Sequence, residues 1–142
     1  MHVFFDEMQQ SVSVPMLLIV DETVRAVVME DVKCVLVLGT PFTLQNKLYQ
    51  NKLRRAGVKV KVPTKTDQKR LFEVIISVLN YGPTQKSRDE LIAIISAYKK
   101  GVDGVILGCT ELPLALQNVR MDVQTFDTLQ ILADAVYNYS IS

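Results

Sequence analysis

Residues 101–114 read GVDGVILGCTELPL, and the expected fold is built outward from this stretch. The apolar run at 104–107 has the length of a buried β-strand. Gly108 then allows a tight turn with little bulk beside the Cys109 thiol. The stretch therefore predicts a strand that ends in a loop carrying a cysteine.

Strand and helix patterns alternate on both sides of this stretch. Apolar runs at 14–20, 33–38 and 123–126 are typical of strands, and 58–62 alternates valine with lysine, as a strand near a sheet edge does. Strands separated by helices favour βαβ crossovers. We therefore expect an α/β fold, an open parallel sheet with flanking helices. The expected helices are residues 21–29, 41–56, a helix with its inner face at 71–79 that ends at 81–83, a helix from 87 that Gly101 closes, and 128–139.

Helix ends carry their own signals. Thr40 followed by proline predicts an N-cap and a first turn, and Gly57 predicts a left-handed end to that helix. Ser87 and Glu90 have the spacing of a capping box.

Threonine recurs in four loops that are expected to follow strands. Ligands in open α/β sheets bind beyond the carboxyl ends of the strands, where hydroxyls and backbone amides suit a small carboxylate. Helix capping alone would also place threonine there. We interpret the coincidence of all four as a ligand site. The loops are Asp21-Glu22-Thr23, Gly39-Thr40-Pro41-Phe42-Thr43, Gly108-Cys109-Thr110-Glu111 and Phe126-Asp127-Thr128.

Composition excludes several classes of function. The 142 residues are 49% hydrophobic, with 16 basic against 15 acidic side chains and no basic block, which argues against a nucleic-acid partner. No apolar run reaches the roughly 20 residues that span a bilayer, and no secretory signal begins the chain, so a cytoplasmic location is expected. Cys34, Cys109 and the single His2 have no metal-ligand spacing, so no metal site is expected.

Cys109 has two interpretations from the residues alone. A helix starting nearby would favour its thiolate, which could act as a base or nucleophile. A buried cysteine can also be a small hydrophobe. Cys34, inside an apolar run, is expected to be structural.

Residues 101–114 closely resemble the second cysteine motif of the aspartate/glutamate racemase superfamily, and the glutamate after Cys-Thr resembles the aspartate racemase branch. The resemblance extends to residues 35–43, to Asp21-Glu22-Thr23 and to Phe126-Asp127-Thr128, in the family's order. It covers nearly the whole chain.

The resemblance implies a racemase without a pyridoxal cofactor, in which one thiolate removes the Cα proton and a thiol on the opposite face delivers another. Cys109 would be one of the two, and Glu111 would bind substrate or raise the pKa of that thiol. The implied substrate is a small amino acid or carboxylate, with aspartate as the first choice. The implied assembly is a homodimer. The other implied contacts are Thr110, Thr40 and Thr43 for the carboxylate, with Asp21, Thr23, Asp127 and Thr128 as substrate contacts or helix caps.

The start of the chain departs from the family. The first catalytic cysteine would precede Met1, so we expect the N-terminal third of a racemase to be missing. Residues 32–112 would form a second α/β domain, and 1–31 with 113–142 part of a first. Cys34 lies four residues before Leu38 and cannot replace the missing thiol, so the chain alone is expected not to racemise amino acids.

Two rival functions stay open. Arylmalonate decarboxylases resemble this fold and use a single cysteine in the second half. A truncated, non-catalytic product that binds a small carboxylate is the other. The sequence upstream of Met1 would separate them.

Overall fold

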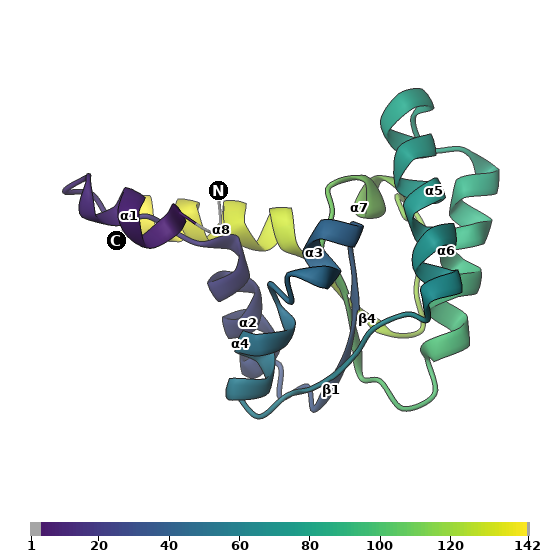
Figure 1. Ribbon diagram of the computed structural model, residues 1–142, viewed down its shortest axis with the longest axis horizontal. Coiled ribbons are helices and arrows are strands. Elements are labelled where there is room, and N and C mark those ends of the chain that lie inside the picture. Colours follow the sequence, from purple (N-terminus) through teal and green to yellow (C-terminus); the bar gives the residue numbers. More distant parts are fainter. Residues whose placement is uncertain (1–3, 142) are drawn as a thin grey trace.

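The computed structural model describes residues 4–141 as an α/β fold on one four-stranded parallel sheet (Figure 1). Its strands are β1 (Cys34–Leu38), β2 (Lys59–Lys61), β3 (Gly104–Leu107) and β4 (Gln124–Asp127). Their spatial order is β2-β1-β3-β4, and every neighbouring pair is parallel. This confirms the predicted fold class, with β2 at an edge. His2 and the start of the chain, on which one expectation rests, lie outside the described residues.

Helices cover both faces of the sheet. The helices α5, α6 and α7 pack on one face, α2 and α4 pack on the other, and α1 and α8 extend to the left in Figure 1. No helix within residues 4–141 is both long and apolar enough to span a membrane. The helices are α1 (Phe5–Gln10), α2 (Ile19–Met29), α3 (Pro41–Gln45), α4 (Gln50–Arg55), α5 (Lys65–Tyr81), α6 (Gln85–Tyr98), α7 (Glu111–Ala115) and α8 (Thr128–Ile141).

The central strand β1 is buried on both faces, which explains its unbroken apolar run. Leu36 and Leu38 belong to the core under α5 and α6, whereas Val35 and Val37 belong to the core under α2 and α4. Side chains alternate between the faces of a strand, so every position of this segment must be apolar. That is why the sequence located this strand.

The apolar run at 14–20 does not form a strand. No strand is assigned there, and helix α2 begins at Ile19, so Asp21, Glu22 and Thr23 lie in its first turns and not in a loop. Pro15 lacks the N–H that a sheet ladder needs. Val20 and Val27 instead form a helical face buried against the sheet.

The expected helix at 41–56 is two helices. Thr40 caps α3 and Pro41 begins it, as predicted, but the chain turns at Lys47, whose φ is 52°, before α4. The Gln50 side chain donates to the carbonyl of Leu44 over 2.9 Å, so it satisfies an acceptor that a continuous helix would pair with its backbone. Gly57 has φ 82°, which confirms the left-handed end.

The capping box of α6 lies three residues earlier than predicted. Thr84 is the N-cap and exchanges hydrogen bonds with Ser87, the third residue of the first turn. Glu90 instead accepts a hydrogen bond from Arg70 over 2.6 Å. The predicted pair was wrong because a serine can act as the N3 partner as well as the cap.

The sheet continues beyond residue 112. Strand β4 pairs with β3 in the register Leu107 opposite Asp127, so a segment assigned to the first domain completes the sheet of the second. The division into 32–112 and 1–31 with 113–142 stays a prediction.

Candidate active site

The carboxyl ends of the parallel strands β1, β3 and β4 lie together at one end of the sheet. The backbone N–H of Gly108 donates to the carbonyl of Leu38 over 2.9 Å, which joins the loops after β1 and β3. Asp127, the last residue of β4, lies opposite Leu107, the last residue of β3. This end of the sheet therefore brings together three of the four threonine loops that the sequence singled out.

Gly108 fixes the path of the loop that carries Cys109. A Cβ added there would lie 2.7 Å from the carbonyl oxygen of Leu38 and 3.2 Å from the Tyr49 ring. Neither neighbour can move easily, because one is strand backbone and the other is a ring that is 3% exposed. Only glycine lets the two loops approach so closely.

Cys109 follows β3 directly and lies half-buried beside the start of α7. Its thiol donates to Oε2 of Glu111 over 2.7 Å, and the Thr110 hydroxyl donates to the same oxygen over 3.0 Å. The sequence places these three residues side by side, and the fold turns them into one hydrogen-bonded group.

The surroundings hold Cys109 as a thiol. Burial, followed by the hydrogen bond to Glu111 and its charge, raises the pKa of Cys109 to about 12. Backbone N–H groups of Glu111 and Thr110 act the other way, as the sequence predicted for a helix start, but they are outweighed. At neutral pH the cysteine is therefore a proton donor.

Glu111 is the complementary acceptor. Burial alone would raise its pKa, but hydrogen bonds from Cys109, its own backbone and Thr110 outweigh burial and lower that pKa. The pair therefore rests as thiol and carboxylate, and one proton lies between them. Glu111 thus holds the thiol proton in a hydrogen bond and does not remove it.

Thr40 and Thr43 form a second polar group in the loop after β1. Their hydroxyl oxygens are 3.1 Å apart, and Thr40 Oγ1 also accepts from the Thr43 N–H. Thr40 is half-buried and Thr43 is 8% exposed. The predicted capping role of Thr40 is confirmed.

Thr23 and Thr128 lie inside the protein. Thr23 is 0% exposed and donates to the Ile19 carbonyl, and Thr128 is 4% exposed and donates to the Leu107 carbonyl. Neither presents a hydroxyl at the surface in this structure, which differs from the expectation that all four loops contribute a threonine to one open site.

Tyr49 joins these buried hydroxyls, and sequence reasoning missed it. Burial raises the pKa of Tyr49, hydrogen bonding with Thr128 and Thr23 partly opposes that rise, and the charge of a Cys109 thiolate would add to it. The ring also contacts Gly108. No short-range motif marks this tyrosine, because its partners come from α2, α8 and the loop after β3.

The two aspartates have partners in the described structure. Asp21 forms an ion pair with Lys52 of α4. Asp127 Oδ1 accepts from the N–H groups of Leu129 and Gln130, which makes it the cap of α8.

Cys34 lies at the opposite end of the strands, the amino-terminal end of the sheet. It is the first residue of β1, whereas Cys109 follows the last residue of β3, and the two strands run parallel. Its backbone N–H donates to Asp103 over 2.9 Å. At about 3.3 Å per residue, the five steps from Cys34 to Gly39 place it roughly 16 Å from the Thr40 loop.

Comparisons with known proteins agree with this geometry. The pattern of the Asp/Glu/Hydantoin racemase family matches residues 1–136. RacX of Bacillus subtilis, a broad specificity amino-acid racemase, is 30% identical over 132 residues, which cover 93% of this chain and 57% of that protein.

Solved structures of racemases and racemase homologues also superpose on this chain. The crystal structure of an aspartate racemase homologue from Pyrococcus horikoshii superposes with a TM-score of 0.89 at 33% identity, over 99% of this chain and 63% of that one. The Picrophilus torridus aspartate racemase gives 0.79 at 25% identity, over 97% and 57%. The chain thus spans about three fifths of the length of these relatives.

Proposed function

The chain belongs to the Asp/Glu/Hydantoin racemase family, and from this premise we propose that it serves an amino-acid racemase of the aspartate or glutamate type. In this proposal Cys109 transfers the Cα proton on one face of the substrate. The observation that carries it is the hydrogen bond from the Cys109 thiol to Glu111. This pair lies at the carboxyl end of the sheet, where the Thr40 loop also begins.

The resting protonation state defines what Cys109 does. As a thiol it can deliver a proton to a planar Cα carbanion, and the thiolate left behind regains a proton from solvent. In the reverse direction the thiol first loses its proton to solvent, because Glu111 is too weak a base to take it, and the thiolate then removes the Cα proton. A substrate ammonium group close to the thiolate would lower its pKa and favour that direction.

The carbanion needs hydrogen-bond donors at the substrate carboxylate, because negative charge spreads onto it in the transition state. The hydroxyls of Thr40, Thr43 and Thr110 are the candidates for this role. Thr23 and Thr128, together with Tyr49, would support the loops from beneath. Asp21 and Asp127 would reach a substrate amine only by exchanging their present partners.

Inversion requires a second acid or base on the opposite face of Cα. Cys34, the only other cysteine of the 142 residues, is at the far end of the sheet. These residues by themselves therefore provide one thiol to the site. We expect them to exchange the Cα proton of one enantiomer without rapid inversion, since water is a poorly positioned donor.

A single-cysteine decarboxylase is the second candidate. The observation in its favour is the same lone thiol, since decarboxylation leaves a carbanion that needs one proton donor. The hydrogen-bonded Cys109 is suited to that donation.

The two functions are separated by their substrates. The purified chain is incubated in D₂O with each enantiomer of aspartate and glutamate and, separately, with phenylmalonate, and ¹H NMR follows loss of the Cα–H signal and formation of phenylacetate. A racemase half-site exchanges one amino-acid enantiomer, and Cys109→Ala removes the exchange. Phenylacetate without exchange supports the decarboxylase. If neither reaction exceeds the Cys109→Ala background, both proposed functions are contradicted.

A further inference from the structure

Basic side chains are concentrated in one segment of the sequence. Residues 32–66 hold eight of the 16 Lys and Arg residues and none of the 15 Asp and Glu residues, so the rest of the chain carries eight basic against 15 acidic side chains. The near-neutral net charge hides this segregation. The expectation that no basic block gathers these residues is therefore corrected. The eight are Lys33, Lys47, Lys52, Arg54, Arg55, Lys59, Lys61 and Lys65.

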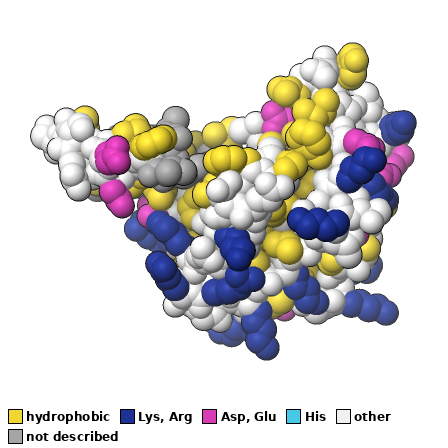
Figure 2. Space-filling view, viewed as in Figure 1, with side chains coloured by type: hydrophobic (Ala, Val, Ile, Leu, Met, Phe, Trp, Pro, Cys, Tyr) yellow, Lys and Arg dark blue, Asp and Glu magenta, His cyan; other side chains and the backbone are white. Residues whose placement is uncertain are grey.

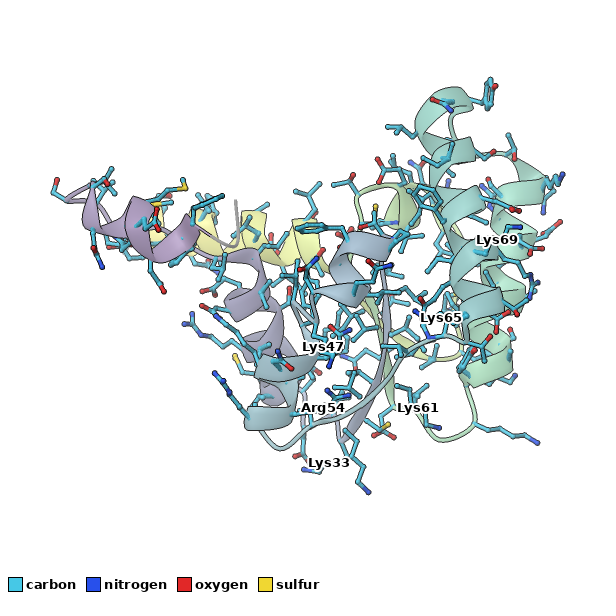
Figure 3. All side chains as sticks on the ribbon, viewed as in Figure 1. Lys33, Lys47, Arg54, Lys61, Lys65 and Lys69 are labelled. Atoms are coloured by element: carbon cyan, nitrogen blue, oxygen red, sulfur yellow. The ribbon has the colours of Figure 1, made fainter. Side chains whose placement is uncertain are left out.

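The fold keeps these charges together. The segment runs from β1 through α3 and α4 to β2 and the start of α5, and basic side chains gather over the lower part of the face in Figure 2. Figure 3 shows Lys47 and Arg54 on the α3–α4 side, with Lys65 at the start of α5.

Most of these cations lack an acidic partner. Lys33 pairs with Asp31 and Lys52 with Asp21, but within residues 4–141 no carboxylate lies in ion-pair distance of Lys47, Arg54 or Lys65. Their positive charge is therefore not neutralised by the described part of the chain.

Those three side chains line one open cavity of about 420 Å³ between α4, the end of β2 and α5. Its other polar lining is the amide side chains of Gln45, Gln50 and Gln68. Gln50 is 3% exposed, and its Oε1 is the one buried side-chain oxygen or nitrogen of the described residues that has no hydrogen-bond partner. The cavity thus combines three cations with the Gln45 amide and with a buried acceptor that could pair with the hydroxyl of a protonated phosphate.

We propose that this cavity binds a small phosphate-bearing anion, such as a phosphate monoester. Two ammonium groups and one guanidinium match the double charge and several acceptor oxygens of phosphate better than the single charge of a carboxylate. The Gln45 amide supplies a neutral donor beside them, whereas Gln50 and Gln68 donate to the carbonyls of Leu44 and Pro63. The volume is that of a small-metabolite site rather than of a surface groove for a polymer.

The site is distinct from the Cys109 end of the sheet, and its occupancy does not depend on the proposed racemase activity. It is linked to that end through α3, because Leu44 and Gln45 line the cavity and Thr43 precedes them in the same helix. A bound anion would hold the α3–α4 turn at Lys47, whose backbone is left-handed.

Titration calorimetry with inorganic phosphate, repeated at several KCl concentrations, tests the proposal. Saturable binding is expected for the wild-type chain and for Cys109→Ala, and the affinity should fall as KCl is added. Arg54→Gln and Lys65→Gln should each weaken binding about tenfold, because each removes a charge-assisted contact.

Lys86→Gln is the matched control, since Lys86, like Lys65, is an exposed lysine in the first turn of a helix. It should leave phosphate binding unchanged. Absence of saturable binding by the wild-type chain, or equal weakening by Lys86→Gln, would overturn the proposal. So would binding of a single-stranded oligonucleotide without saturable phosphate binding, because the basic face would then serve a polyanion.

Discussion

Cys109 illustrates how much of a residue's chemistry comes from its contacts. The sequence places Glu111 two residues away and predicts that its charge raises the pKa of the thiol. The structure shows that burial contributes more than that charge does and that the thiol donates directly to the carboxylate.

Glu111→Gln should make Cys109 more reactive. The change removes the negative charge and the strong acceptor that favour the thiol, so the pKa of Cys109 should fall, although burial keeps it above the ordinary value. The rate of alkylation by iodoacetamide, followed at Cys109 by peptide mass spectrometry, should rise several-fold at pH 8. Asp89→Asn, an exposed carboxylate on α6, is the control. An unchanged pH profile in Glu111→Gln would show that the observed contact does not set the pKa.

Gly108→Ala should damage both stability and the site. The added Cβ meets the Leu38 carbonyl at 2.7 Å, so the loops after β1 and β3 must separate, at a cost of about 1–3 kcal/mol in the free energy of unfolding. Urea denaturation measures the cost, and Cys109 alkylation reports the change in the loop. Gly82→Ala has open space but a φ of 76°, so it should destabilise without altering Cys109. Equal alkylation in both variants would refute the steric argument.

The sequence identified Cys109, Thr40 and Thr43 because each follows a strongly patterned strand. It did not identify Tyr49, whose ring contacts Gly108 and whose hydroxyl interacts with Thr23 and Thr128. Those partners come from three separate segments, so only the folded chain brings them together.

Elements were predictable where the apolar pattern was continuous. The strand β1 was found because both of its faces are buried, whereas the run before α2 was misassigned because an apolar stretch of that length fits a strand or a helix equally well. The turn between α3 and α4 includes a hydrogen bond from the Gln50 side chain to the Leu44 carbonyl, a contact that no helix propensity describes.

The observed N-cap of α6 at Thr84 can be tested by mutation. Thr84→Ala should reduce the free energy of unfolding by about 1 kcal/mol, because its hydroxyl accepts from the Ser87 N–H at the helix start. Urea denaturation measures the change. Thr66→Ala, an exposed position inside α5, should cost much less. A smaller loss for Thr84→Ala than for Thr66→Ala would contradict the assigned cap.

At the scale of the whole molecule, α8 is the least covered of the three long helices α5, α6 and α8. Thr128 is its one buried residue within the described part, and large apolar side chains are exposed along it, as is Phe4 near the other end of the chain. The exposed side chains of α8 are Leu129, Val136, Tyr137, Tyr139 and Ile141.

We expect this apolar surface to drive concentration-dependent self-association. Size-exclusion chromatography with light scattering should show the mean mass rising with concentration, and Leu129→Ser with Val136→Ser should lower it. The matched control is Phe72→Ser with Leu79→Ser on α5, which should leave the mass unchanged. A monomer at every concentration would contradict this expectation and the implied homodimer.

The proposed activity depends on Cys109 as the group that transfers the Cα proton. The most direct measurement is deuterium incorporation at Cα of D- and L-aspartate in D₂O, compared between Cys109→Ser and Cys34→Ser. A serine hydroxyl is a far weaker acid than a thiol, so Cys109→Ser should lose exchange, while Cys34→Ser at the opposite end of the sheet should keep the wild-type rate. Exchange retained in Cys109→Ser, or lost only in Cys34→Ser, would contradict the assignment.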